Sequence, residues 1–186
     1  MFSRKLSTKE NIVIGIGLPT KSKEEVKISM IIFQPDKPRM MYSKQQLHSD
    51  ELPYFTCGSE HVLIQVKNVK IGIGICYETL LPEHSENLKK LGADILIASV
   101  AKSQNGLNKA SKYYPEVCKS HAIPILMANS IGQCDDFLSV GKSSVWNKQG
   151  ESIAHLDSVN EGLLIFDFEA EKCFKNSLLT TIANSI

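Results

Sequence analysis

The sequence predicts an α/β fold in which strands dominate the first half and the last third of the chain. Four apolar runs in the first half are separated by charged or turn-forming stretches, a pattern typical of strands. These runs are residues 11–17, 26–33, 61–66 and 69–76. After Cys76, helical and apolar segments alternate, which indicates parallel strands with helices packed on a sheet face. No repeat or linker interrupts the chain, so we expect residues 1–186 to form a single domain.

The first helix of the second half is expected where an amphipathic segment begins at Pro82 and stops before Gly92. Proline suits the first turn of a helix, and glycine favours its end. The later elements are expected to be a strand at 94–99, a helix at 108–121, strands at 123–129, 143–146, 152–155 and 162–168, and a short helix-like tail. Pro115 lies inside the helix expected at 108–121.

Charge and hydropathy exclude several classes of partner. The chain has 21 basic and 20 acidic side chains, mixed along its length, so it lacks the basic surface that nucleic acids or anionic membranes require. No apolar stretch is long enough to span a membrane, and the first residues lack the apolar segment of a secretory signal. We therefore expect a cytoplasmic protein that acts on a small molecule.

The five cysteines are odd in number, widely spaced and free of Cys-x-x-Cys pairs, which disfavours a disulfide framework and a zinc site. The five histidines show no ligand-like spacing either, so neither a metal nor a cofactor is expected. Four of the cysteines are expected to be mostly buried small apolar residues.

Cys76 differs from the other cysteines because it ends an apolar strand just before a helix. That position places a thiol at the edge of a sheet, where pockets form in open α/β folds, and it suits a nucleophile. Lys44 closes a short strand-like segment at 40–44, and Glu51 follows in a loop. A nearby cation stabilises a thiolate and a developing oxyanion. From the residues alone, a solvated lysine and a solvated glutamate remain the alternative.

Several ordered motifs resemble the carbon–nitrogen hydrolase, or nitrilase, superfamily. They are Tyr42-x-Lys44-x-x-Leu47, Glu51-x-x-x-Phe55-x-x-Gly58, Gly74-Ile75-Cys76-Tyr77-Glu78 and Leu81-Pro82-Glu83. The likeness continues to about residue 144 and begins near residue 7. It implies a four-layer α-β-β-α sandwich, an α+β arrangement shortened at its N-terminus, with the active site between two sheets.

The resemblance also implies roles for individual residues. Cys76 is similar to the nucleophile that attacks an amide or nitrile carbon and forms a thioester, which water then hydrolyses. Lys44 and the backbone N–H of Tyr77 would stabilise the oxyanion. Glu51 matches a supporting glutamate that orients the lysine or helps to place the substrate. Glu78 is expected to be either a structural carboxylate or a substrate contact.

The chain departs from the family pattern at the general base, a glutamate that ends an early strand in a Pro-Glu context. Glu10, Glu24 and Glu25 do not fit that context. Turnover would then be slow or absent, unless Glu51 takes over as the base, and the alternative is a non-catalytic scaffold or binding module. A sandwich without its first strands would also expose a sheet edge, so we expect either a shortened version of a complete enzyme or a reduced homologue whose partner chain covers that edge. A homo-oligomer is the expected assembly.

A nucleotide-binding function is a further alternative. Residues 15–22 nearly match a phosphate-binding Gly-x-x-x-x-Gly-Lys-Ser loop. Pro19 removes a backbone N–H that the loop would use, and Thr20 resists the positive φ that glycine supplies. Both residues make this alternative weak.

Overall fold

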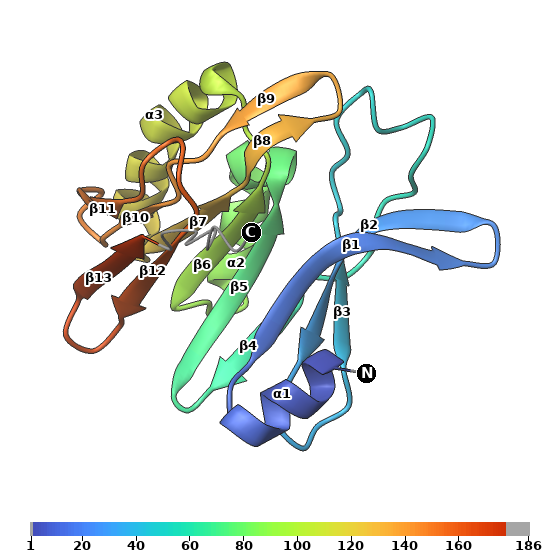
Figure 1. The fold of residues 1–186 in the computed structure, drawn as a ribbon, viewed down its shortest axis with the longest axis horizontal. Helices are drawn as coiled ribbons and strands as arrows, with labels where there is room; N and C mark the ends of the chain where they lie inside the picture. Colours follow the sequence, from blue (N-terminus) through green and yellow to red (C-terminus); the bar gives the residue numbers. More distant parts are fainter. Residues whose placement is uncertain (1, 178–186) are drawn as a thin grey trace, which may run out of the picture.

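In the computed structural model, which describes residues 2–177, two β-sheets pack face to face, and two helices cover the far side of the larger sheet (Figure 1). The smaller sheet is antiparallel and has the strand order β1-β2-β3. Its strands are β1 (Ile14–Ser22), β2 (Glu25–Phe33) and β3 (Met40–Ser43). Helix α1 (Phe2–Glu10) precedes this sheet and contacts β2.

The larger sheet has six strands in the order β11-β10-β7-β6-β5-β4. Its central strands are parallel: β5 (Val69–Ile75), β6 (Ile95–Val100) and β7 (Ile125–Asn129). The antiparallel strands are β4 (Leu63–Val66), β10 (Ser144–Trp146) and β11 (Ser152–His155). The crossovers are the 3₁₀-helix η1 (Cys76–Leu80) with α2 (Pro82–Lys90), and α3 (Gln104–His121). Two separate hairpins complete the described chain: β8 (Ile131–Cys134) with β9 (Phe137–Val140), and β12 (Gly162–Asp167) with β13 (Lys172–Ser177).

Strand β5 shows why the layers stack in this way. Its residues alternate between the two faces of the sheet, so Ile73 and Ile75 face the apolar layer shared with β2 and β3. On the other face, a Cβ atom at Gly74 would lie 2.5 Å from Thr79 Cγ2 and 2.7 Å from His84 Nε2. Glycine at this position therefore lets η1 and α2 approach the strand closely.

A second apolar layer lies between the larger sheet and helices α2 and α3. Tyr114 of α3 is fully buried and meets Trp146 edge-on, with their ring centroids 5.3 Å apart. Ser103 caps the start of α3 by accepting a hydrogen bond from the Gly106 N–H, so the helix begins four residues before the expected position. Pro115 lies inside the helix as predicted.

The prediction of a mixed α+β sandwich is confirmed. Helix α1 was not predicted, because its short and largely polar sequence lacks a clear apolar stripe. The tail was expected to be helix-like, but residues 172–177 form a strand, and residues 178–186 lie outside the described part.

The phosphate-loop alternative is wrong, because residues 15–22 belong to strand β1, which pairs with β2 from Ile14 opposite Phe33 to Ser22 opposite Glu25. Backbone groups used in such a ladder cannot form a phosphate cradle. Within residues 2–177, no helix has the length and apolar character needed to cross a membrane.

We predict that His84 makes the fold sensitive to acid. Burial lowers the pKa of this histidine from 6.5 to about 4. The unfolded chain then binds more protons between these two values, so the free energy of unfolding falls as pH drops from 6.5 towards 4, on the order of 1 kcal/mol per pH unit. Urea unfolding at several pH values measures this slope.

The matched controls for this prediction are His84→Gln, which removes the titrating group, and His155→Gln, at an exposed position. The first substitution is expected to flatten the slope by about one proton, and the second is expected to leave it unchanged. An equal slope in the unsubstituted protein and His84→Gln would contradict the role of His84.

Candidate active site

Cys76 lies immediately after β5, at the first position of η1, as its place in the sequence predicted. Its φ angle is +50°, an uncommon value for a residue other than glycine. Such backbone conformations cost free energy, and they cluster at functional sites. The Cys76 thiol points to the backbone oxygen of Ala101, 3.7 Å away, which follows the neighbouring parallel strand β6. The carboxyl ends of two adjacent strands thus frame the sulfur.

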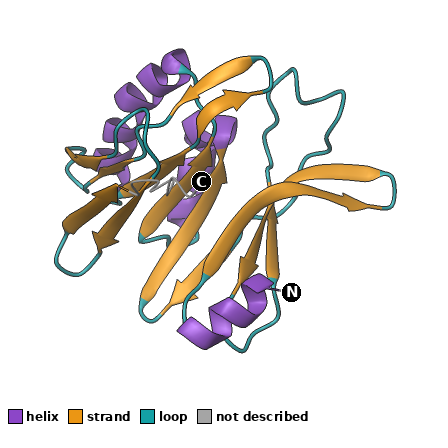
Figure 2. Ribbon diagram, in the orientation of Figure 1, coloured by secondary structure: helices purple, strands orange, loops and turns teal. Residues whose placement is uncertain are grey.

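Lys44 and Glu51 lie on the long loop that joins β3 to β4, drawn as a teal connection in Figure 2. The Lys44 ammonium donates to both oxygens of Glu51, at 2.5 and 2.6 Å. The Lys44 side chain is fully buried, whereas that of Glu51 is 21% exposed. Glu51 also accepts a hydrogen bond from the His48 N–H at 2.7 Å, which fixes the carboxylate within its loop.

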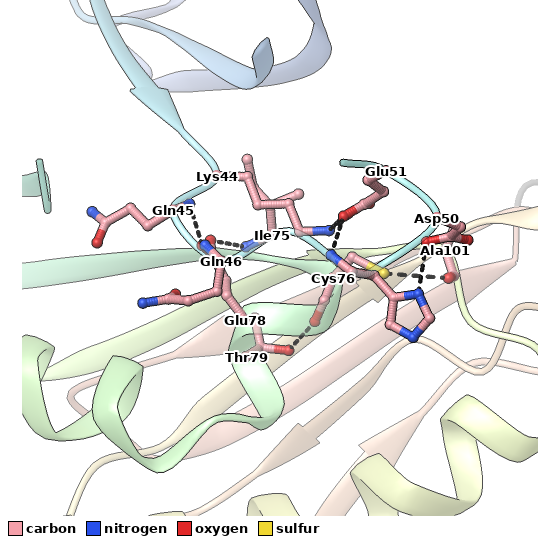
Figure 3. Close-up of polar contacts among 11 residues, drawn as sticks. Lys44, Gln45, Gln46, Asp50, Glu51, Ile75, Cys76, Glu78, Thr79 and Ala101 are labelled. Atoms are coloured by element: carbon pink, nitrogen blue, oxygen red, sulfur yellow. Dashed lines mark hydrogen bonds and ion pairs between the residues drawn. The ribbon is translucent and has the colours of Figure 1, made fainter. Parts of the chain in front are cut away.

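A cavity of about 610 Å³ brings these separate segments together. Cys76 and Tyr77 from η1 line it together with Lys44 and Glu51 from the β3–β4 loop. Figure 3 shows the Lys44–Glu51 pair and the Cys76 thiol in this region. The volume is sufficient for a small organic molecule. Four of the five predicted site residues therefore share one cavity.

Tyr77 is the second residue of η1, so its N–H lies in the first turn, before the hydrogen bonds of the 3₁₀-helix begin. Among residues 2–177 no acceptor binds this N–H, so it can donate to a ligand next to the sulfur, as an oxyanion contact would require. The Tyr77 ring also packs edge-on against His48, with ring centroids 5.1 Å apart.

Glu78 does not line the cavity, so the predicted substrate-binding role does not fit its position. Its side chain is completely buried and accepts hydrogen bonds from Tyr42 Oη at 2.6 Å, the Ile75 N–H at 2.7 Å and the Gln45 N–H at 2.7 Å. Its oxygens are thus occupied by protein donors. Burial raises the pKa of this carboxyl, and the bonds from Tyr42 and the backbone oppose that rise.

Lys102 is a cavity residue that sequence reasoning missed. It follows the buried strand β6 by two residues, and polar side chains at the carboxyl ends of parallel strands often face a ligand site, a signal that could have found it. Asn129 holds its backbone, because Asn129 Oδ1 accepts from the Lys102 N–H at 2.8 Å. Asn129 Nδ2 also donates to the Gly141 oxygen at 2.6 Å, which ties the end of β7 to the turn before β10.

The other cysteines meet the expectation of burial to different degrees. Cys118 is buried, Cys134 and Cys173 are half-buried, and Cys57 is exposed. Cys57 lies on the β3–β4 loop, where no apolar layer covers it, so the expectation was wrong for this residue. Cys134 lines the same cavity as Cys76.

Glutamates considered as substitutes for the general base lie elsewhere. Glu10 ends α1, Glu24 lies in the β1–β2 turn and Glu25 begins β2; all three are exposed and outside the cavity lining. Within residues 2–177, the carboxylates that line the cavity are Asp50, Glu51 and Asp135.

The chain is similar in sequence to known proteins. The family model described as carbon-nitrogen hydrolase matches residues 2–174. A probable nitrilase from Schizosaccharomyces pombe is 26% identical over 174 residues, which cover 89% of this chain and 62% of that protein. The chain therefore spans less than two thirds of this curated relative.

Solved structures show the same fold at lower identity. The glutamine-dependent NAD+ synthetase from Acinetobacter baumannii superimposes with a TM-score of 0.80 and 22% identity, covering 91% of this chain and 34% of that one. A mutant amidase from Nesterenkonia sp. AN1, with acrylamide added at its active-site cysteine, superimposes with a TM-score of 0.74 and 18% identity. The match covers 84% of this chain and 63% of that one.

We predict that Glu78 is structurally indispensable. In Glu78→Gln, an amide NH₂ replaces one of two oxygens that both accept from protein donors, so at least one buried donor loses its acceptor. The free energy of unfolding should fall by about 2–4 kcal/mol. Tyr42→Phe removes only one donor and should cost about 1 kcal/mol. Urea unfolding of both variants measures these losses, and an unchanged Glu78→Gln midpoint would be inconsistent with the buried network.

Proposed function

Since the chain belongs to the carbon–nitrogen hydrolase family, we propose that it hydrolyses the amide or nitrile of a small molecule through a thioester on Cys76. The observation that carries this proposal is the shared cavity, in which a thiol, a buried ammonium and a free backbone N–H occur together. The amidase from Nesterenkonia sp. AN1 supports it, because acrylamide adds to the active-site cysteine of that protein.

For an amide substrate, the proposed reaction has two displacements. The Cys76 sulfur bonds to the amide carbon, and the negative charge passes to the carbonyl oxygen, where Lys44 and the Tyr77 N–H stabilise it. The carbon–nitrogen bond then breaks, and the nitrogen leaves as ammonia or an amine after taking up the proton that the Cys76 thiol gives up. Water attacks the resulting thioester, the carbon–sulfur bond breaks, and a carboxylic acid and the thiol are released.

Glu51 is proposed to position Lys44 rather than to act as the general base. Both of its oxygens already accept from the Lys44 ammonium, and one accepts from the His48 N–H as well. With its oxygens engaged in this way, the carboxylate holds the ammonium in one orientation.

A binding module without turnover is the second candidate. The observation that favours it is the engagement of Glu51 by Lys44, together with the placement of Glu10, Glu24 and Glu25 outside the cavity. A cytoplasmic location and a homo-oligomeric state remain predictions. The exposed apolar residues Ile16 and Leu18, on the β1 strand at the edge of the smaller sheet, support the latter.

We predict that the protein releases ammonia from at least one member of a panel of short aliphatic amides and nitriles. Cys76→Ala should abolish this release, because the thioester cannot form. Cys134→Ala is the matched control, since it removes a second cavity thiol, and it should retain most of the activity. Ammonia release that survives in Cys76→Ala would contradict the mechanism, and a panel with no turnover would favour the binding module.

Glu51→Gln separates positioning from base catalysis. We expect amide hydrolysis to fall by about 10²-fold, because the Lys44 ammonium is no longer held in the orientation that meets the oxyanion. Alkylation of Cys76 by iodoacetamide should not slow, because the Lys44 ammonium remains and no longer has its neutralising partner. Mass spectrometry of the Cys76 peptide measures the alkylation rate. A parallel fall in both rates would instead identify Glu51 as the proton acceptor of the thiol.

A further inference from the structure

Lys102 occupies a fixed position beside the nucleophile. It follows Ala101, whose backbone oxygen accepts from the Cys76 thiol, and both residues come directly after β6. Its N–H donates to Asn129 Oδ1 at 2.8 Å, and its backbone oxygen accepts from the Val140 N–H at 3.1 Å. The backbone from which this side chain enters the cavity is therefore held on both sides.

Among the described residues, the buried Lys102 side chain has no carboxylate partner. The residue is only 4% exposed and lines the cavity. Within residues 2–177, its ammonium has no carboxylate oxygen within 4.0 Å and no hydrogen-bond acceptor, in contrast to Lys44. A buried ammonium without an anion is costly, and such a site favours a ligand that supplies one.

The electrostatic surroundings of Lys102 are positive. Burial lowers the pKa of its ammonium, and the charges of Lys44 and Lys109 act in the same direction, against the effect of Cys76. Ser103 and Gly106, at the N-terminus of α3, line the cavity next to it, and the first turn of this helix contains no acidic residue. The positive end of an 18-residue helix thus adds to the lysine charge.

The carboxylates of the cavity do not cancel this charge. Glu51 is bound by Lys44, and Asp50 accepts from the His48 ring at 2.6 Å. Asp135 lies in the turn between β8 and β9, and it makes no ion pair with Lys102. The wall formed by Lys102 and the start of α3 is therefore the part of the cavity that best fits an anion.

We propose that Lys102 and the N-terminus of α3 form a subsite for a carboxylate of the substrate, which makes the substrate an amide or nitrile that also carries an acid group. This inference rests on the proposed function, because it assigns the part of the substrate that does not react. Lys102 would contribute to substrate binding and selectivity, while Cys76 and Lys44 act at the carbon that is attacked.

Two alkylating agents of nearly equal size test the subsite without requiring turnover. Iodoacetate carries a carboxylate, and iodoacetamide is its neutral counterpart; mass spectrometry of the Cys76 peptide gives the rate for each. We expect Lys102→Met to lower the iodoacetate rate at least about tenfold relative to iodoacetamide, since a charge-assisted contact is lost. Lys102→Arg should keep most of the preference. Lys112→Met is the matched control on the exposed side of α3 and should leave the ratio unchanged.

The remaining outcomes of the alkylation test either overturn the subsite or call for a test on the unsubstituted protein. An unchanged ratio in Lys102→Met would overturn the subsite, and so would an equal fall in both rates, which would mean that Lys102 acts on the thiol or on packing. If Lys102→Met fails to fold, the unsubstituted protein decides the matter. Glutarate should then protect Cys76 from iodoacetamide more strongly than the neutral diamide of glutarate does, and equal protection would overturn the proposal.

Hydrolysis assays separate this inference from the proposed function. Where turnover is observed, the monoamide of glutarate should be preferred to pentanamide, and Lys102→Met should remove the preference. A protein that turns over no amide or nitrile of the panel but retains the Lys102-dependent alkylation ratio would contradict the hydrolase function and support the subsite. Turnover of both amides at rates that Lys102→Met does not change would support the hydrolase function and refute the subsite.

Discussion

The buried carboxylate of Glu78 joins the two halves of the site. It accepts from Tyr42 and from the Gln45 N–H, residues that flank Lys44 on the side of the smaller sheet. It also accepts from the Ile75 N–H, which precedes Cys76 on the larger sheet. The apolar layer between the sheets sets their spacing, and this one side chain fixes how the two strand ends meet. A lysine and a cysteine 32 residues apart in the sequence thereby reach the same cavity.

Two lysines in this cavity are held in different electrostatic states. Lys44 is buried together with a carboxylate that binds it through both oxygens, so its position is fixed and its charge is largely balanced. Lys102 is almost as buried, but within the described chain it has no such partner. A balanced ammonium suits a contact that strengthens only as an oxyanion develops. An unbalanced one suits a ligand that arrives already charged.

Part of this architecture could be predicted from the sequence. The alternation of apolar residues located β2, β4 and β5, and the end of β5 at Cys76 followed from that pattern. Lys44 and Glu51 were identified by resemblance, because periodicity does not show where a long loop returns to a sheet. Glu78 could not be assigned from the residues, since a buried carboxylate and an exposed one look alike in sequence. Lys102 was not predicted, although the sequence already shows that it follows a buried parallel strand.

The most direct test of the account is to trap the covalent intermediate with an activated ester. Rapid acid quenching after mixing the protein with p-nitrophenyl butyrate should leave a butyryl group on the Cys76 peptide, detected by its mass. Lys44→Met should form this adduct at least about tenfold more slowly, because the oxyanion loses a donor. An adduct on another cysteine, or one that forms at the same rate without Lys44, would contradict the claim that these two residues act together.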